Sequence, residues 1–183
     1  MDREAFLEKV LEHYTGCYDI VRAEEAKMPL AATAEYHEHN VGYMLSRKAE
    51  MWSADRHEYV WFWSIPVLTE EVYTALYAQT LEAGTKRVDP DSGHMCSNIV
   101  AVFLCDRADE AALTALSRAK GRKMFMLGLK GWMEVHTAAA VMETSEVHGN
   151  RDARNEKTFL NSIFRPVRKR SSILKKISAV CSD

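Results

Sequence analysis

Five consecutive residues, Glu-Tyr-His-Glu-His at positions 35–39, form the densest group of side chains that could do chemistry. In a β-strand, side chains alternate between two faces, which puts Glu35, His37 and His39 on one face. Two imidazoles and a carboxylate are ligands that a divalent metal ion accepts. Residues two apart on a strand stand about 7 Å apart, so a metal site here needs a further ligand from a neighbouring strand.

His57 and Glu58 are the nearest candidates for that further ligand. A simpler interpretation is that polar residues gather at the solvent-facing end of a strand, beside a turn. A lone His-x-His pair is more typical of this surface situation. We therefore expect no cofactor, and we assign a divalent metal to Glu35, His37 and His39 only under a hydrolytic function.

The C-terminus is the second feature with possible chemistry. Residues 165–183 hold six basic residues and one acidic residue, whereas residues 1–164 hold 18 basic and 25 acidic residues. This tail is interpreted as the only strongly basic stretch of the chain. Its residues could make weak contacts with the phosphates of a polyanion. The alternative is that the tail is a solvated terminus without a partner. The candidate polyanion-binding residues are Arg165, Arg168, Lys169, Arg170, Lys175 and Lys176.

Four scattered cysteines include no Cys-x-x-Cys pair, which excludes a zinc knuckle and a thioredoxin-type motif. They are expected to be reduced, mostly buried thiols. The sequence matches no P-loop, dinucleotide-binding glycine turn, Gly-x-Ser-x-Gly elbow or His-Glu-x-x-His motif. These absences lower the expectation of an enzyme.

Apolar periodicity, capping residues and turn residues predict the elements that would position these side chains. The first half of the chain is predicted to form a helix over 2–16, three strands joined by tight turns, and a helix from Thr69 to Gly84. The three strands are predicted over 30–39, 43–52 and 57–65, with turns at 39–42 and 53–56. Consecutive strands with such short turns predict an antiparallel meander.

The second half of the chain is predicted to form a strand over 98–105, a helix over 109–120 and a returning strand over 124–129. Together they make a βαβ unit. A further strand over 132–141, a short hairpin over 142–150 and a helix over 152–164 follow. The predicted fold class is α+β, with a mixed β-sheet built from a three-stranded meander, a βαβ unit and a further strand, and with helices packed on it.

The 183 residues fit a single domain over 1–164, followed by the basic tail over 165–183. The N-terminus carries charges at every turn and lacks the apolar stretch of a secretory signal. No segment approaches the ~18 to 20 apolar residues of a membrane span. We therefore expect a cytoplasmic protein that is not an integral membrane protein.

The segment from Phe125 to Asn150, with an aromatic strand, a Lys-Gly-Trp turn and a closing hairpin, resembles a family of uncharacterised bacterial proteins. The resemblance spans the whole domain and implies an intracellular protein without assigned chemistry.

The order of predicted elements over residues 2–105 also resembles the core of the restriction-endonuclease-like nucleases. That resemblance implies carboxylate-bound magnesium and hydrolysis of phosphodiesters. The family carries a Glu-x-Lys on its third strand, whereas this chain reads Glu-Tyr-Val from Glu58, and Lys48 and Glu50 stand in reversed order on the preceding strand. The element order is therefore present without the motif.

Taken together, these patterns favour a non-catalytic intracellular binding or regulatory module. The alternative is a metal-dependent hydrolase or nuclease that uses the face of Glu35, His37 and His39.

Overall fold

A computed structural model of the protein describes residues 1–24, 28–43, 50–90 and 94–165; for residues 39–43 and 50–54 the description is limited to the backbone. The helices are α1 (Arg3–Tyr14), α2 (Glu70–Arg87), α3 (Glu110–Arg118) and α4 (Arg154–Phe164), with a short 3₁₀ turn η2 (Met126–Gly128). The strands are β1 (Asp19–Arg22), β2 (Leu30–Tyr43), β3 (Glu50–Leu68), β4 (His94–Ala108), β5 (Arg122–Met124), β6 (Trp132–Val141) and β7 (Glu146–Gly149).

These strands form one mixed sheet of seven strands. The order is β1-β2-β3-β4-β6-β5. β5 pairs with the start of β6, and β7 pairs with the end of β6. β1, β2 and β3 form the antiparallel meander, β3, β4 and β6 run parallel to one another, and β5 and β7 are antiparallel to β6. The predicted α+β class with a mixed sheet is confirmed.

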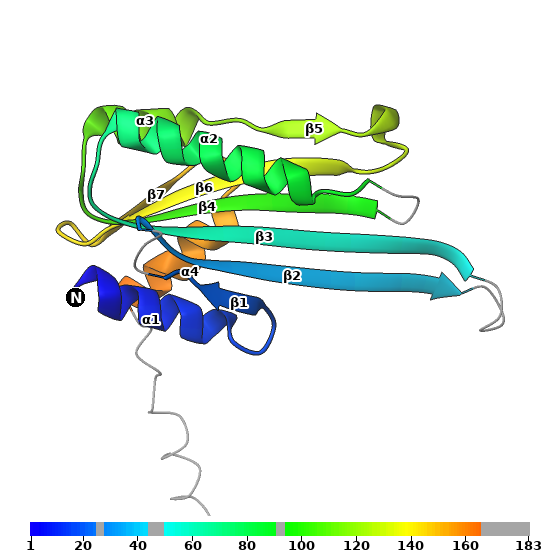
Figure 1. Ribbon diagram of the computed structural model, residues 1–183, viewed down its shortest axis with the longest axis horizontal. Helices are drawn as coiled ribbons and strands as arrows, with labels where there is room; N and C mark the ends of the chain where they lie inside the picture. Colours follow the sequence, from blue (N-terminus) through cyan, green and yellow to red (C-terminus); the bar gives the residue numbers. More distant parts are fainter. Residues whose placement is uncertain (25–27, 44–49, 91–93, 166–183) are drawn as a thin grey trace, which may run out of the picture.

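The helices cover both faces of the sheet, so the molecule has three layers (Figure 1). On one face, α2 and α3 bury Tyr73, Leu76 and Leu116 against the sheet. On the other face, α1 and α4 bury Phe6 and Leu160 against it. We call these the α2/α3 face and the α1/α4 face. In the described part of the chain, no helix combines the length and apolar character needed to cross a bilayer.

Two of the predicted helices, α1 and α2, begin after a residue whose side chain caps the first turn. The side chain of Asp2 accepts a hydrogen bond from the amide of Ala5 at 2.7 Å, and that of Thr69 accepts one from Val72 at 3.3 Å. After α1, Gly16 adopts a φ of +96°, a conformation that glycine enters without penalty. Gly84, in contrast, was predicted to end a helix and instead lies inside α2.

The strand boundaries of the meander differ from the prediction. β1 was missed, and the two predicted turns at 39–42 and 53–56 lie inside β2 and β3. The predicted strand over 43–52 is instead the end of one strand and the start of the next, and residues 44–49 lie outside the described residues. Pairing runs continuously from His37 opposite His57 to Gly42 opposite Trp52, which outweighs the local preference of Gly and Asn for turns.

The βαβ unit also differs from the prediction. The segment predicted to return as a strand over 124–129 is a short end of β5 followed by η2, and the strand parallel to β4 is β6. A second parallel crossover, β3-α2-β4, was not predicted. Both crossovers step across the sheet in the same direction, so the right-handed rule places α2 and α3 on one face.

Candidate functional site

Glu35 and His37 lie on the α2/α3 face, in the middle of β2 rather than at a strand end. Glu35 forms an ion pair with Arg87 at the end of α2, and its other oxygen lies 3.8 Å from Nε2 of His37. Nδ1 of His37 lies 2.8 Å from Nδ1 of His57. The predicted alternation therefore holds, and His57 joins His37 as the sequence suggested.

The backbone of His39 pairs in register with Asp55, and its side chain lies outside the described residues. Among the side chains that the structure describes, no group of three His, Cys, Asp or Glu residues could hold a metal ion. Arg87 competes with any cation for Glu35. A metal site at Glu35, His37 and His39 therefore stays a prediction of the sequence.

A third histidine completes a group that we call the histidine cluster, consisting of His37, His57 and His94. The rings of His57 and His94 stack with centroids 6.1 Å apart. His94 is buried, with Nδ1 2.8 Å from the carbonyl oxygen of Lys130 and Nε2 2.9 Å from Oγ of Ser97. This histidine ties the start of β4 to the loop before β6, which is a structural role.

The described part of the basic tail is limited to Arg165, which is exposed at the end of α4. The other five predicted polyanion-binding residues lie outside the described residues; they are Arg168, Lys169, Arg170, Lys175 and Lys176.

The opposite face of the sheet holds a cavity of about 290 Å³ that we call the carboxylate pocket. It lies at the amino-terminal ends of the parallel strands, between the end of α1 and the first turns of α4. Its lining residues are His13, Tyr14, Cys17, Tyr18, Arg56, Glu58, Asn98, His136, Asn155, Glu156 and Phe159. The volume suits a ligand at the small end of the range for small-molecule sites.

Glu58 reaches the pocket because side chains alternate along β3, which sends His57 to one face and Glu58 to the other. Tyr18 reaches it because Gly16 turns the chain back from α1. The hydroxyl of Tyr18 donates a hydrogen bond to Oε1 of Glu58 at 2.8 Å, and the amide of Asn98 lies 3.5 Å from Oε2. Burial, followed by the charge of Glu58, raises the pKa of Tyr18, so the phenol stays protonated as a donor.

Glu156 is held in place by a buried anchor at the start of α4. The side-chain oxygen of Asn150 accepts from the amides of Thr137 at 3.3 Å and Ala153 at 3.0 Å. Its amide nitrogen donates to the carbonyl oxygens of Val135 at 2.9 Å and Ala119 at 3.2 Å. One side chain thus joins β6, the end of α3 and the start of α4, and it sets where α4 meets the sheet.

With α4 fixed, Oε1 of Glu156 accepts a hydrogen bond from Nδ1 of His136 at 2.6 Å. Burial by itself lowers the pKa of His136. The hydrogen bond from this histidine to Glu156 and the charges of Glu156, Glu58 and Glu134 outweigh burial, so the pKa of His136 is raised. The pocket therefore favours a positive charge at this position.

The second oxygen of Glu156 is different. Oε2 is buried and has no hydrogen-bond partner among the described residues. The Glu156 side chain as a whole is only 8% exposed. A buried carboxylate oxygen without a donor is costly, and such atoms in native proteins nearly always have a partner. Oε2 is therefore an atom of the pocket wall whose hydrogen-bonding capacity the described residues do not meet.

Aromatic rings form one wall of the pocket. The ring of His13 stacks on Phe159 with centroids 4.3 Å apart, and Tyr14 packs against Phe159 at 5.8 Å and against Tyr18 at 4.5 Å. Electron-rich ring faces next to carboxylates form a setting that attracts organic cations.

Arg56 lines both this pocket and a wider, more open groove of about 560 Å³ beside it. The groove adds Arg151 and Arg154 from the segment that leads into α4. The groove therefore carries three guanidinium groups beside the carboxylates of Glu134 and Asp152.

The sequence interpretation missed this pocket. One signal was present, because Glu134 and His136 are two polar residues on one face of the otherwise apolar β6. The other members come from segments far apart in the chain, and nothing local indicates that they meet.

Fold and pocket together define a three-layer α+β domain with a small polar cavity under two helices. The family model described as "Domain of unknown function (DUF8052)" matches residues 2–162, and the chain belongs to this family. This confirms the resemblance to an uncharacterised family. No curated protein and no solved structure matches the chain.

Proposed function

We propose that the protein is a non-catalytic binding module that takes a small molecule bearing an amine into the carboxylate pocket. The observation that carries the proposal is the buried Oε2 of Glu156, which has no donor among the described residues. An ammonium group supplies N–H donors of the kind that Oε2 lacks within the described part of the chain, and such a charge-assisted hydrogen bond is stronger than one from a neutral donor.

The surroundings narrow the class of ligand. Glu58 and Glu156 face the pocket from the sheet and from α4, and the rings of Tyr14 and Phe159 offer cation–π contact. Arg56 at the junction with the wider groove favours an acidic group on the same ligand. A zwitterion of amino-acid size satisfies both ends, and the volume of about 290 Å³ fits that size.

The arrangement of His136 supports binding rather than catalysis. In a nucleophile–histidine–carboxylate constellation, the histidine nitrogen remote from the carboxylate faces the nucleophile. Here Nδ1 binds Glu156, and Nε2 lies 3.9 Å from Oε2 of a second carboxylate, Glu134. His136 is therefore better suited to balancing charge than to activating a nucleophile.

The test is a thermal-shift screen of the full chain against amino acids, simple amines and simple carboxylic acids, followed by calorimetry on each hit. We expect amine-bearing compounds to raise the melting temperature and carboxylic acids without an amine to have no effect. In Glu156→Gln, the affinity for the hit should fall by about tenfold or more, since a charge-assisted hydrogen bond is lost.

The matched control is Glu110→Gln, which removes an exposed carboxylate on α3, far from the pocket. It should bind as the natural chain does. Equal affinity of Glu156→Gln and the natural chain would overturn the proposal, as would a screen without any amine among its hits. The ligand should be recovered chemically unchanged after incubation, and its conversion would overturn the non-catalytic part.

A cytoplasmic, bacterial setting is part of the same proposal. The three described cysteines, Cys17, Cys96 and Cys105, are free thiols, and burial raises the pKa of both Cys96 and Cys105. Free thiols are typical of a reducing compartment. The bacterial source is supported by the resemblance alone.

The C-terminal tail is proposed to make weak, salt-sensitive contacts with polyanions. If all six of its charges met phosphates, log affinity would fall with log salt at a slope of about −5. Truncation after Phe164 should abolish this binding, as titration of labelled duplex DNA at low and physiological salt would show.

A further inference from the structure

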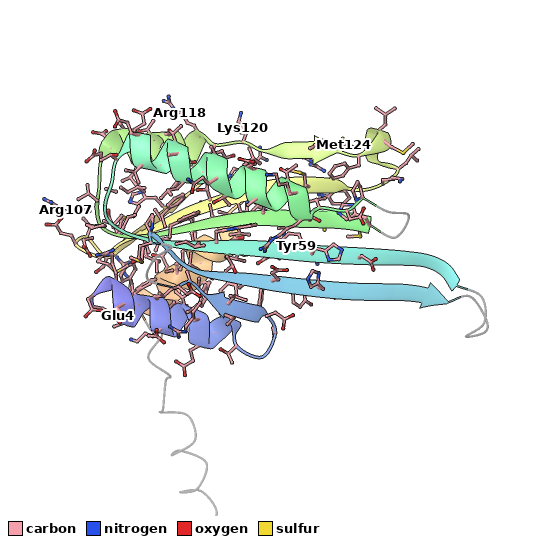
Figure 2. The ribbon with its side chains drawn as sticks, in the orientation of Figure 1. Glu4, Tyr59, Arg107, Arg118, Lys120 and Met124 are labelled. Atoms are coloured by element: carbon pink, nitrogen blue, oxygen red, sulfur yellow. The ribbon has the colours of Figure 1, made fainter. Side chains whose placement is uncertain are left out.

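An apolar loop projects from the molecule where β5 leads into η2. Four of its side chains are strongly exposed: Leu127 at 96%, Leu129 at 84%, Met126 at 63% and Met124 at 57%. Grouped apolar side chains at such exposure, unlike scattered ones, mark an interaction surface. Figure 2 shows Met124 on the opposite side of the molecule from α1, at the end of β5.

The loop is built to keep these side chains outside. Met126 and Leu127 adopt φ values of +44° and +56°, which are unfavourable for residues with a side chain. Backbone hydrogen bonds hold this conformation, from Gly128 to the carbonyl of Phe125 at 2.9 Å and from Phe125 to that of Gly131 at 3.0 Å. An unfavourable backbone that its surroundings maintain is typical of a functional segment.

The base of the loop is anchored in the fold. The ring of Phe125 packs against the core of the α2/α3 face and against His94, with centroids 5.7 Å apart. Gly131 approaches the backbone of Met95 so closely that a Cβ would lie 2.2 Å from its carbonyl oxygen. The apolar tip is therefore presented on a fixed support.

Basic residues flank the tip along the chain. Residues 111–133 contain five basic residues and no acidic residue, which makes this segment a second basic stretch and corrects the interpretation of the tail as the only one. The five are Arg118, Lys120, Arg122, Lys123 and Lys130. Figure 2 shows Arg118 and Lys120 on the same side of the molecule as Met124. Arg122 lies 3.5 Å from Glu134 and over the ring of Trp132, and Nζ of Lys123 lies 5.4 Å from the centroid of the Phe125 ring.

We propose that this loop docks the protein on the surface of an anionic phospholipid bilayer, with the apolar tip inserted between headgroups and the flanking basic residues against lipid phosphates. An exposed apolar tip flanked by basic residues is the combination that binds to an anionic bilayer surface. A nucleic acid would use the cations and leave the apolar tip in water. A protein partner offers no general reason for a segment with five basic residues and no acidic residue.

The experiment measures sedimentation of the full chain with vesicles of phosphatidylcholine alone and of phosphatidylcholine mixed with phosphatidylserine. We expect binding to the mixed vesicles, weaker binding to the neutral ones, and loss of binding at high salt. The double variant Leu127→Asn/Leu129→Gln should bind about tenfold more weakly, because the apolar insertion is lost. Asparagine is chosen since it tolerates a positive φ.

Matched controls separate the loop from other surfaces. Val21→Gln replaces a side chain that is 66% exposed on β1, and Lys9→Gln replaces an exposed lysine on α1. Both should bind as the natural chain does, whereas Lys123→Gln/Lys130→Gln should bind several-fold more weakly. The basic tail is present in every variant, so its contribution cancels.

Equal vesicle binding by the Leu127→Asn/Leu129→Gln variant and the natural chain would overturn the proposal, provided that both melt at the same temperature. A concentration-dependent dimer that forms only with the natural loop, without vesicle binding, would also overturn it, because the occupant would then be a second copy of this chain.

Discussion

The two faces of the sheet use polar residues in different ways. On the α2/α3 face, the polar groups that the sequence highlighted are paired with one another: Glu35 with Arg87, and His37 with His57. On the α1/α4 face, His136 and Glu156 form one short hydrogen bond, and a second carboxylate oxygen stays buried without a donor among the described residues. Polar density along the chain thus points to one face, whereas the buried carboxylate oxygen that lacks a donor in the described part of the chain lies on the other.

The two faces also differ in how their helices are attached. α2 approaches the sheet at Gly84, where a Cβ would lie 2.6 Å from Cγ2 of Ile99. α4 is fixed at its start by the four hydrogen bonds of Asn150. One face therefore depends on close apolar packing, and the face with the pocket depends on a buried polar anchor.

The largest expected effect comes from Asn150→Ala. The change leaves two amides and two carbonyl groups without their partner, so the free energy of unfolding should fall by about 3 kcal/mol or more. Urea denaturation measures it. The control is Asn161→Ala, since the Asn161 amide donates only to the carbonyl of Lys157. A smaller loss in Asn150→Ala than in this control would contradict the anchoring role.

Gly84→Ala tests the packing of the α2/α3 face. Helix propensity alone would stabilise this substitution by about 1 kcal/mol. We expect a net loss of about 2 kcal/mol instead, because the new methyl group overlaps Ile99. The double variant Gly84→Ala/Ile99→Val should recover part of the lost free energy of unfolding, as thermal or urea unfolding would show. A Gly84→Ala protein that is more stable than the natural chain would show that α2 does not pack tightly on β4 at Gly84.

Glu156→Gln tests the charge balance of the pocket. The pKa of His136 is raised in the folded protein, so the stability that its charge contributes is complete below the ordinary value of 6.5 and is lost as the pH rises through the folded value. Near pH 6, Glu156→Gln should lower the free energy of unfolding by about 2 kcal/mol, since a hydrogen bond between charged groups is lost. The difference should shrink as the pH rises through the folded pKa of His136, and parallel stability curves would contradict this linkage.

The smallest effect is expected at the histidine cluster. His37→Ala should change the free energy of unfolding by no more than about 0.5 kcal/mol, because the side chain is about half exposed. Elemental analysis of the purified protein should find no stoichiometric zinc or manganese. A bound metal that is lost in His37→Ala would reverse the comparison of the two faces and favour the metal-dependent hydrolase.

Several features of this protein follow from local sequence. Asp2 and Thr69 begin helices because their side chains satisfy free amides of the first turn. The apolar run of β6 and the alternation of Glu35 and His37 are readable because the period of a strand is a property of neighbouring residues. These local signals suffice for the α+β class and for the placing of two predicted site residues on one face.

Tertiary structure alone decided which strand lies beside which. β6 rather than residues 124–129 pairs with β4, and β2 and β3 continue through residues typical of turns, because long-range pairing outweighs local preference. The carboxylate pocket depends on that strand order and on the layer that α4 occupies. Tyr18, Glu58, His136 and Glu156 meet only after both are set, since their distances in the chain carry no information about their distances in space.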